Sequence, residues 1–429
     1  MKVGIYTLGC KVNTYESEYV ASLLENAGYE ISSFDDICDI YIINTCTVTN
    51  QSDSKSRKII NQAIKKNPNA CVVAMGCFIE ANKDIEIEGV DILLGNKDKS
   101  KIVTLLEEWY KNHTPIKDLY NDLGTTFEDM KIKTIKDHTR AFVKIQDGCE
   151  NYCTYCIIPY VRGKCRSKKK EIVLKEITEL IENGYKEIVL TGIHTGNYGV
   201  DLNYTFYDLL KEIIEIKGLK RLRISSIEVT ELNPQVLSII ENSNIICNHL
   251  HIPLQAGSNH VLKMMNRKYD LKYYEDKINS IRKIRPDISI STDIIVGFPG
   301  ETDDDFQETL LFADKMKFSK IHAFPYSKRA NTPASSFPNQ IDGSIKKERN
   351  HKLIELSNKL EIEYMEKFIN KELEVLTEKT VDGYTYGHTS NYLLVRIKGN
   401  YDSNTFITVK IDSVNYPYCE GFCVNEITC

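Results

Sequence analysis

Three cysteines in the middle of the chain have a spacing that suits an iron–sulfur cluster. Cys149, Cys153 and Cys156 form a C-x3-C-x2-C run directly after Asp147 and Gly148. Three thiolates can hold three irons of a 4Fe-4S cube and leave the fourth iron open for a substrate or cofactor. A structural zinc site needs four ligands, and neither a second C-x2-C pair nor a nearby histidine follows this run. The spacing therefore indicates iron–sulfur chemistry.

Three more cysteines, Cys10, Cys46 and Cys77, each follow an expected strand by a few residues. The strands are Val3–Tyr6, Ile40–Ile43 and Val72–Met75. In an open parallel sheet the loops at the carboxyl ends of the strands form the ligand crevice, so these cysteines should converge there. The convergence suggests a second cluster, with three ordinary buried thiols as the alternative that strand positions alone leave open. Cys38 and Cys71 precede their strands and are expected to be ordinary buried thiols.

Alternating strands and helices must position both sets of three cysteines. Short β-branched runs and helices near Glu16–Asn26 and Lys55–Lys65 predict an N-terminal open parallel α/β domain over residues 1–112. A polar segment, 113–138, is expected to be a linker. From 139 to 368, six strands separated by amphipathic helices predict a partial (β/α)6 barrel. These strands are Ala141–Ile145, Glu187–Leu190, Arg221–Ile224, His249–Ile252, Ser291–Val296 and Lys320–Phe324.

The last part of the chain changes character. After a charged helix at about Lys346–Phe368, residues 369–429 contain strand-like runs that predict a small β-barrel. These runs are Leu373–Glu378, Leu393–Ile397, Phe406–Ile411 and Phe422–Ile427. The fold class is therefore α/β with an appended β-barrel.

Composition narrows the class of protein. The 429 residues include 13 cysteines and carry a formal net charge of -5. No apolar run approaches the roughly 20 residues of a membrane helix, so we expect a cytoplasmic protein with reduced cysteines. The negative charge excludes a surface coated for nucleic-acid binding, and any RNA contact must come from local patches. The basic run Arg162–Lys170 and the cluster Lys55, Arg57 and Lys58 are the candidates for phosphate contact.

Together these motifs resemble the methylthiotransferase family of the radical-SAM superfamily. The resemblance is carried by Thr7–Asn13, Asn44–Thr49, Gly76-Cys77, the C-x3-C-x2-C run and His251–Ser258. It implies an N-terminal domain that binds an auxiliary 4Fe-4S cluster through Cys10, Cys46 and Cys77, a radical-SAM barrel, and a C-terminal TRAM barrel.

The resemblance also implies a division of chemistry between the two clusters. One S-adenosylmethionine is cleaved at the Cys149, Cys153 and Cys156 cluster to a radical that abstracts hydrogen from the target carbon. A second methylates a sulfur on the auxiliary cluster. A one-electron reductant of flavodoxin or ferredoxin type is an implied partner, and the sulfur donor is left open. The C2–H of adenine resists acid–base attack, so a radical route suits it.

Six residues match positions where the superfamily contacts S-adenosylmethionine. The implied cofactor-binding residues are Tyr155, Gly192, Glu228, Gln255, Asp293 and Gly297. Val229 stands after the glutamate where the family usually has proline. No catalytic residue beyond the clusters is assigned.

The substrate is predicted from which branch of the family the motifs resemble. Gly9–Glu18 and Gly387–Leu393 resemble the branch that acts on N6-threonylcarbamoyladenosine of tRNA, at position 37 next to the anticodon. The implied partner is the anticodon stem-loop. The alternatives are an aspartate of a ribosomal protein, or isopentenyladenosine in tRNA, as substrate. From a different class, the alternative is a zinc-stabilised RNA-binding protein without catalysis.

Overall fold

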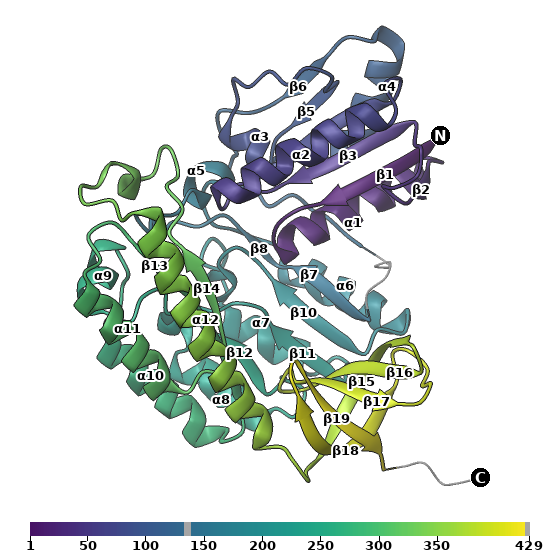
Figure 1. Ribbon diagram of the computed structural model, residues 1–429. Coiled ribbons are helices and arrows are strands. Elements are labelled where there is room, and N and C mark those ends of the chain that lie inside the picture. The colour runs from purple at the N-terminus through teal and green to yellow at the C-terminus, as the bar shows by residue number, and fades with distance from the viewer. Residues whose placement is uncertain (133–138, 425–429) are drawn as a thin grey trace.

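Three structural units follow one another along the chain in a computed structural model that describes residues 1–132 and 139–424. Figure 1 shows the N-terminal α/β unit in purple and blue, the central half-barrel in teal and green, and the C-terminal β-barrel in yellow. This arrangement confirms the predicted α/β fold class. Among the described helices, none combines the length and apolar character needed to cross a bilayer.

The N-terminal unit is a six-stranded parallel sheet in the order β2-β1-β3-β4-β5-β6. Its strands are β1 (Lys2–Thr7), β2 (Glu30–Ser32), β3 (Ile40–Thr45), β4 (Cys71–Gly76), β5 (Ile92–Leu94) and β6 (Ile116–Asp118). Its helices are α1 (Lys11–Asn26), α2 (Asn50–Lys66), α3 (Cys77–Ala81) and α4 (Ile102–Asn112). Every residue of β3 and β4 is buried, because separate hydrophobic clusters cover the two faces of the sheet.

Two details differ from the sequence-based expectation. Helix α1 begins directly after Cys10, five residues before the expected start at Glu16, because Val12 and Asn13 are also buried in the helix. Within the segment expected to be a linker, β6 pairs with β5 and extends the sheet. Residues 133–138 of that segment lie outside the described residues.

The central unit consists of two three-stranded parallel sheets, β11-β10-β7 and β12-β13-β14. The strands are β7 (Arg140–Lys144), β10 (Glu187–Thr191), β11 (Arg221–Ile224), β12 (His249–His251), β13 (Ser289–Val296) and β14 (Lys320–Pro325), with a short pair β8 (Gln146–Asp147) and β9 (Arg166–Ser167). A bridge between Leu222 and Ile246 joins the two sheets. In the described part of the chain β7 and β14 do not pair, so the barrel is open between them.

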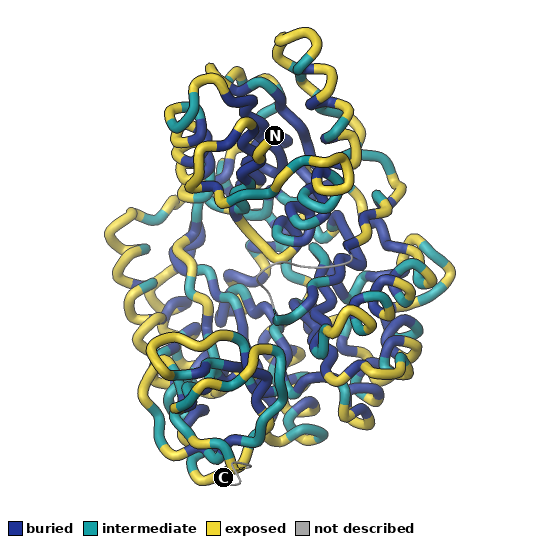
Figure 2. The backbone as a smooth tube through the Cα atoms, turned by 90° about the vertical axis from the view of Figure 1, so that its right-hand side faces the viewer, coloured by how far each residue is buried: buried dark blue, intermediate teal, exposed yellow. Residues whose placement is uncertain are grey.

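Helices cover the outside of this half-barrel. They are α6 (Lys170–Glu182), α7 (Phe206–Ile213), α8 (Pro234–Asn242), α9 (Asn259–Met264), α10 (Leu271–Ile284), α11 (Asp303–Met316) and α12 (Gly343–Glu366). The short helix α5 (Ile158–Arg162) instead packs against α3 of the N-terminal unit. Single 3-10 turns occur at Lys99–Lys101, Thr195–Asn197, Val229–Glu231 and Pro333–Ser336. Figure 2 shows the buried backbone inside the half-barrel and exposed stretches on its outer surface.

The C-terminal unit is a closed barrel of five strands in the order β15-β16-β17-β19-β18. They are β15 (Glu372–Val381), β16 (Tyr384–Thr389), β17 (Leu394–Lys398), β18 (Phe406–Asn415) and β19 (Tyr418–Cys423). The sequence analysis missed β16, whose central Gly387 weakens the strand signal. A Cβ at Gly387 would collide with the backbone carbonyl of Leu376, so the close strand approach requires glycine. The last strand begins at Tyr418, before the expected Phe422, and residues 425–427 lie outside the described residues.

Buried ion pairs attach the C-terminal barrel to the half-barrel. The carboxylate of Glu187 in β10 accepts a 2.7 Å hydrogen bond from Nε of Arg223 and lies 3.7 Å from Arg221. Arg221 in turn donates to the backbone carbonyls of Glu374 and His388 in the C-terminal barrel, at 2.8 and 3.0 Å. Burial alone would raise the pKa of Glu187, but the arginines, Arg223 foremost, hold it below its ordinary value.

Replacing Glu187 with glutamine should therefore destabilise the protein by about 3 kcal/mol, since the buried Arg223 loses its counter-charge, whereas Arg221 keeps Glu374 at 3.1 Å. The folded-state pKa is depressed, so the contribution is present above the unfolded carboxyl pKa of about 4.3 and is lost as the pH falls through the folded value. Thermal unfolding from pH 4 to 8 measures this, with exposed Glu182→Gln as the control. An equal melting temperature for both variants at pH 7 would contradict the assignment.

Candidate iron–sulfur and cofactor site

The loop that carries Cys149, Cys153 and Cys156 lies between β8 and α5, at the carboxyl end of β7. Gly148 precedes it with a φ of 76°, and a Cβ there would collide with the backbone carbonyl of Lys164. Only glycine fits this turn without strain. The amide of Cys156 donates to the carbonyl of Cys153 at 2.9 Å, which folds the second half of the loop into a tight turn.

The environment of these thiols combines burial with nearby cations. Burial, with smaller contributions from the other two cysteines, raises the pKa of Cys156 to about 12. Nη1 of Arg267 lies 3.4 Å from Sγ of Cys153 and offsets part of the negative charge that thiolates would bring. Iron binding requires deprotonated thiols, so loading this site releases protons.

Cys10, Cys46 and Cys77 directly follow or lie just beyond the carboxyl ends of β1, β3 and β4, which are neighbours in the sheet. Hydrogen bonds tie their loops together. Nδ2 of Asn13 donates to the carbonyls of Leu8 and Thr45, at 2.8 and 3.0 Å.

The third loop is joined to the second through Thr45, whose hydroxyl donates to the carbonyl of Met75 at 2.6 Å and accepts from the amide of Phe78 at 3.2 Å. The structure thus brings the three cysteines to one edge of the sheet. Cys71 opens β4 at the opposite edge, and Cys38 precedes β3 there.

Each cysteine set offers three thiolates, which suits a cluster that gives each sulfur its own iron. Separately, His251, Asp293 and His322 each place one ligand atom within 4.8 Å of the others.

A buried ion-pair network separates the two cysteine sets. Arg162 in α5 donates to Glu16 of α1 at 2.8 Å and to Asp147 at 3.1 Å, and Lys144 contacts both carboxylates at 2.7 Å. All four side chains are at most 5% exposed. Burial opposes these charges, yet the cations hold the pKa of Glu16 and that of Asp147 below their ordinary values.

This network corrects part of the expectation that Arg162–Lys170 contacts phosphate: Lys164 and Lys169 are exposed, whereas three other cations of the run are buried. Arg162 and Arg166 are buried against Asp147, and Lys168 is buried in an ion pair with Glu176. Sequence reasoning missed the network because its members lie far apart along the chain. In contrast, Lys55, Arg57 and Lys58 are exposed on α2.

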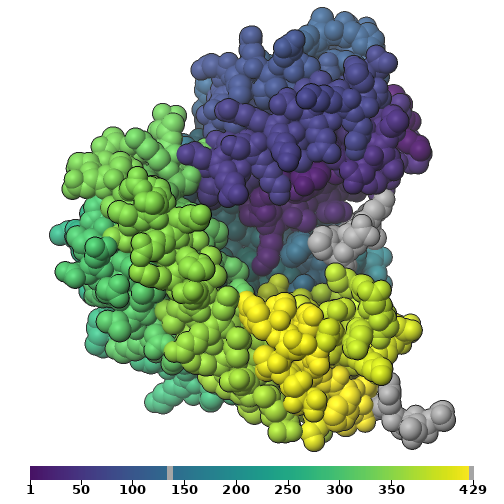
Figure 3. All heavy atoms as spheres, viewed as in Figure 1, coloured from purple at the N-terminus to yellow at the C-terminus, as the bar shows by residue number. Residues whose placement is uncertain are grey.

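Two cavities meet at the carboxyl end of the half-barrel. The smaller, of about 240 Å³, is lined by Val48 and Thr49 after Cys46 and by Tyr155 and Cys156. The larger, of about 690 Å³, extends from Cys10 through the open side of the half-barrel to the C-terminal barrel. Figure 3 shows the molecule hollowed where the purple, teal and yellow parts meet.

The six residues that the resemblance implies as cofactor contacts differ in their position relative to the two cavities. Tyr155 and Gln255 line the smaller cavity and Gly192 the larger, while Asp293 lines both. Glu228 forms an ion pair with Arg267, the residue that also contacts Cys153. Glu228, like Gly297, lines neither cavity, but Arg267 connects it to the cysteine loop.

The sixth, Gly297, lines neither cavity. Its amide donates to Oε1 of Glu301 at 2.9 Å, and a Cβ there would collide with the side chain of Lys346. The structure gives this glycine the role of a turn residue.

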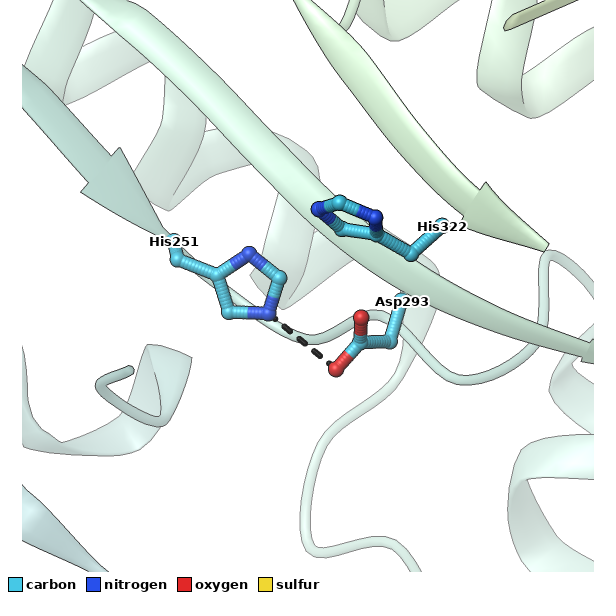
Figure 4. A group of neighbouring side chains, drawn as sticks. All are labelled: His251, Asp293 and His322. Carbon is cyan, nitrogen blue, oxygen red and sulfur yellow. Dashed lines mark hydrogen bonds and ion pairs between the residues drawn. The ribbon is translucent and has the colours of Figure 1, made fainter. Parts of the chain in front are cut away.

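Asp293 also belongs to a group with two histidines, which Figure 4 shows. Nε2 of His251 lies 3.1 Å from Oδ2 of Asp293, and Nδ1 of the same ring is 2.9 Å from the hydroxyl of Ser291. His322 on β14 lies beside this pair, its ring centroid 5.6 Å from that of His251. Burial lowers the pKa of His322, which favours a neutral imidazole. Both histidines line the larger cavity.

A further histidine, His194, lies beside the first cysteine set. Its Nδ1 is 3.8 Å from Sγ of Cys149, and its ring forms an ion pair with Glu231. Burial opposes the charged ring, but the contacts with Cys149 and Glu231 raise the pKa of His194 to about 10. A cationic imidazole therefore faces the position of the first cluster.

Known proteins share these features. Residues 143–313 match the radical SAM superfamily, and residues 2–95 match the uncharacterized protein family UPF0004. A radical S-adenosylmethionine methyltransferase of Kitasatospora setae, TsrM, solved with cobalamin and a 4Fe-4S cluster, superposes with a TM-score of 0.58 at 13% identity, over 78% of this chain and 77% of that one. That likeness concerns the fold alone. The three-cysteine loop and the match of residues 143–313 to the radical SAM superfamily define a radical-SAM enzyme.

Relatives that match along nearly the whole chain indicate a more specific family within this superfamily. A threonylcarbamoyladenosine tRNA methylthiotransferase MtaB of Bacillus subtilis is 44% identical over 98% of this chain and 95% of its own. A tRNA-2-methylthio-N(6)-dimethylallyladenosine synthase of Carboxydothermus hydrogenoformans is 36% identical over 98% of each chain. The chain therefore belongs to the radical-SAM methylthiotransferase family, as its motifs predicted.

The iron content of the reconstituted protein tests whether each cysteine set binds its own cluster. Reconstituted protein is expected to bind about eight irons per chain, and Cys46→Ala about four, because each cube needs its three cysteines. Cys38→Ala is the matched control: its thiol is buried at the opposite edge of the same sheet and should leave about eight. Iron and sulfide analysis after anaerobic purification measures this. Zinc in place of iron would contradict both cluster assignments.

Proposed function

We propose that this protein methylthiolates C2 of N6-threonylcarbamoyladenosine in tRNA, at position 37 beside the anticodon. One observation carries the proposal: the loop after Cys46 and the loop of Cys156 line the same cavity of about 240 Å³. A reaction that needs hydrogen abstraction and sulfur delivery at one carbon requires its two sulfur-ligated centres to face one space.

The assignments of the individual residues follow from their places around that space. Cys149, Cys153 and Cys156 would hold one 4Fe-4S cluster, and Cys10, Cys46 and Cys77 the auxiliary one. When bound, the clusters and S-adenosylmethionine supply the one-electron cleavage and the sulfur. Tyr155, Gln255 and Asp293 are placed to orient the cofactor, since they line the cavity beside Cys156.

The proposed macromolecular partner is the anticodon stem-loop. Lys55, Arg57 and Lys58 form an exposed basic stripe on α2, the helix that follows the Cys46 loop. These cations could bind phosphates of the anticodon stem-loop while the target base enters the cavity between the N-terminal unit and the half-barrel. The electron donor is proposed to be a flavodoxin or ferredoxin.

The choice of nucleoside rests on the motifs around Cys10 and on relatives named for threonylcarbamoyladenosine, which are 44% and 39% identical to this chain. Relatives named for dimethylallyladenosine are 36% and 37% identical. A relative of Chlamydia pneumoniae named for threonylcarbamoyladenosine is 35% identical, so identity alone does not separate the two groups, and the motifs around Cys10 carry the choice.

Mass spectrometry of tRNA nucleosides from cells lacking the gene tests the substrate. We expect 2-methylthio-N6-threonylcarbamoyladenosine to disappear and its unthiolated precursor to accumulate, while 2-methylthio-isopentenyladenosine stays unchanged. Return of the product on complementation is the control. An unchanged level of the threonylcarbamoyl product would reject the proposal, and an unthiolated ribosomal-protein aspartate would identify the alternative substrate.

Replacing Cys77 with alanine tests the division of labour. The variant should lose methylthio product by more than about tenfold while still forming 5′-deoxyadenosine, because the Cys149 set remains intact. Cys71→Ala, a buried cysteine at the opposite end of β4, the strand that directly precedes Cys77, serves as the matched control and should retain product. Equal loss of product and of 5′-deoxyadenosine in Cys77→Ala would refute two separate roles.

A further inference from the structure

The larger cavity brings together residues from all three units. Lys11 enters it from the start of α1, and His249 and His251 belong to β12 in the central unit. Tyr392, from the loop before β17 in the C-terminal unit, also lines the cavity. The centroid of its ring lies 4.9 Å from that of His249. About 690 Å³ falls in the range of pockets that enclose a nucleoside-sized ligand.

Among the described residues, most charged side chains that line this cavity have a partner of opposite charge, and one lysine does not. Lys320 forms an ion pair with Glu361, and Asp293 is hydrogen-bonded to His251. Behind the wall, the arginines have carboxylate partners: Arg221 and Arg223 contact Glu187, and Arg140 contacts Glu378.

Lys11 is the exception. In the described part of the chain, its ammonium group has no hydrogen bond and no ion pair, although the side chain is accessible and lines the cavity. The first turn of α1 contains no acidic residue. A lysine held at a protein-enclosed cavity without a carboxylate suits an anionic ligand group, because enclosure strengthens such a pair.

We propose that Lys11 binds the carboxylate of an amino-acid substituent on the target nucleoside and thereby selects the threonylcarbamoyl substrate. The inference rests on the proposed function. The threonyl carboxylate is the anionic group that an isopentenyl substituent lacks. Lys11 adjoins Cys10, so a substituent held by this lysine keeps the purine next to the auxiliary cysteines. His249 and His322, on the same cavity wall, present imidazoles for further hydrogen bonds.

The test compares two synthetic anticodon stem-loops that differ in one charge. One carries N6-threonylcarbamoyladenosine and the other its threonine methyl ester, and both are titrated into reconstituted holoenzyme by fluorescence anisotropy. Wild type should bind the acid at least about tenfold more tightly than the ester, because the ester removes the partner of a partly enclosed cation. Lys11→Gln should bring the two affinities within about twofold by weakening only the acid, and Lys11→Arg should keep the preference.

Lys320→Gln is the matched control, a lysine of the same cavity that Glu361 already neutralises, and its acid-to-ester ratio should equal that of wild type. Iron content is measured for every variant, so that loss of the neighbouring cluster is recognised. A wild type that binds and methylthiolates acid and ester alike overturns the inference but leaves the proposed function standing. A wild type that methylthiolates only an isopentenyladenosine stem-loop overturns both. Retained preference in Lys11→Gln also overturns the role of Lys11.

Discussion

The structure depends on the buried network of Glu16, Arg162, Lys144 and Asp147. Glu16 lies on the helix that begins after Cys10, whereas Asp147 and Arg162 flank the loop of the other cysteine set. With both carboxylates shared by two cations at 2.7 to 3.1 Å, the two loops cannot shift independently without leaving a buried charge unpaired. The network therefore fixes the distance between two sites built on different folding units.

The same cations influence the chemistry of the thiols. Burial raises the pKa of Cys77 to about 11, and the charge of Arg162 opposes that increase. Arg267 has the corresponding position at Cys153, where it also pairs with Glu228. Each cysteine set thus contains a buried thiol with one arginine beside it, whereas Cys10 is exposed. The arginine compensates part of the negative charge that a bound thiolate would bring.

How far the site could be predicted depends on how local its signal is. The C-x3-C-x2-C spacing is visible in eight consecutive positions, Cys149 to Cys156, because one loop supplies the whole ligand set. Cys10, Cys46 and Cys77 required the strand order as well, and the parallel neighbours β1, β3 and β4 supply it. Arg162 could not be interpreted correctly from sequence, since a basic run resembles an RNA contact until Glu16, 146 residues away, is known to be its partner. Strand β16 was missed for a related reason: Gly387 serves a close approach to Leu376 that only the folded barrel creates.

The open side of the half-barrel explains why the C-terminal barrel contributes to the site. Because β7 and β14 do not pair among the described strands, the interior between them would be exposed to solvent. Tyr392 covers part of it: its backbone has a φ of 67°, and its ring lies between His249 and His388 with the guanidinium of Arg223 4.6 Å from its centroid. A tyrosine held in a left-handed conformation by neighbours on three sides is a costly arrangement for a surface module. This strain is consistent with a functional role for Tyr392, because the C-terminal barrel forms one wall of the cavity that Cys10, Lys11 and Asp293 also line.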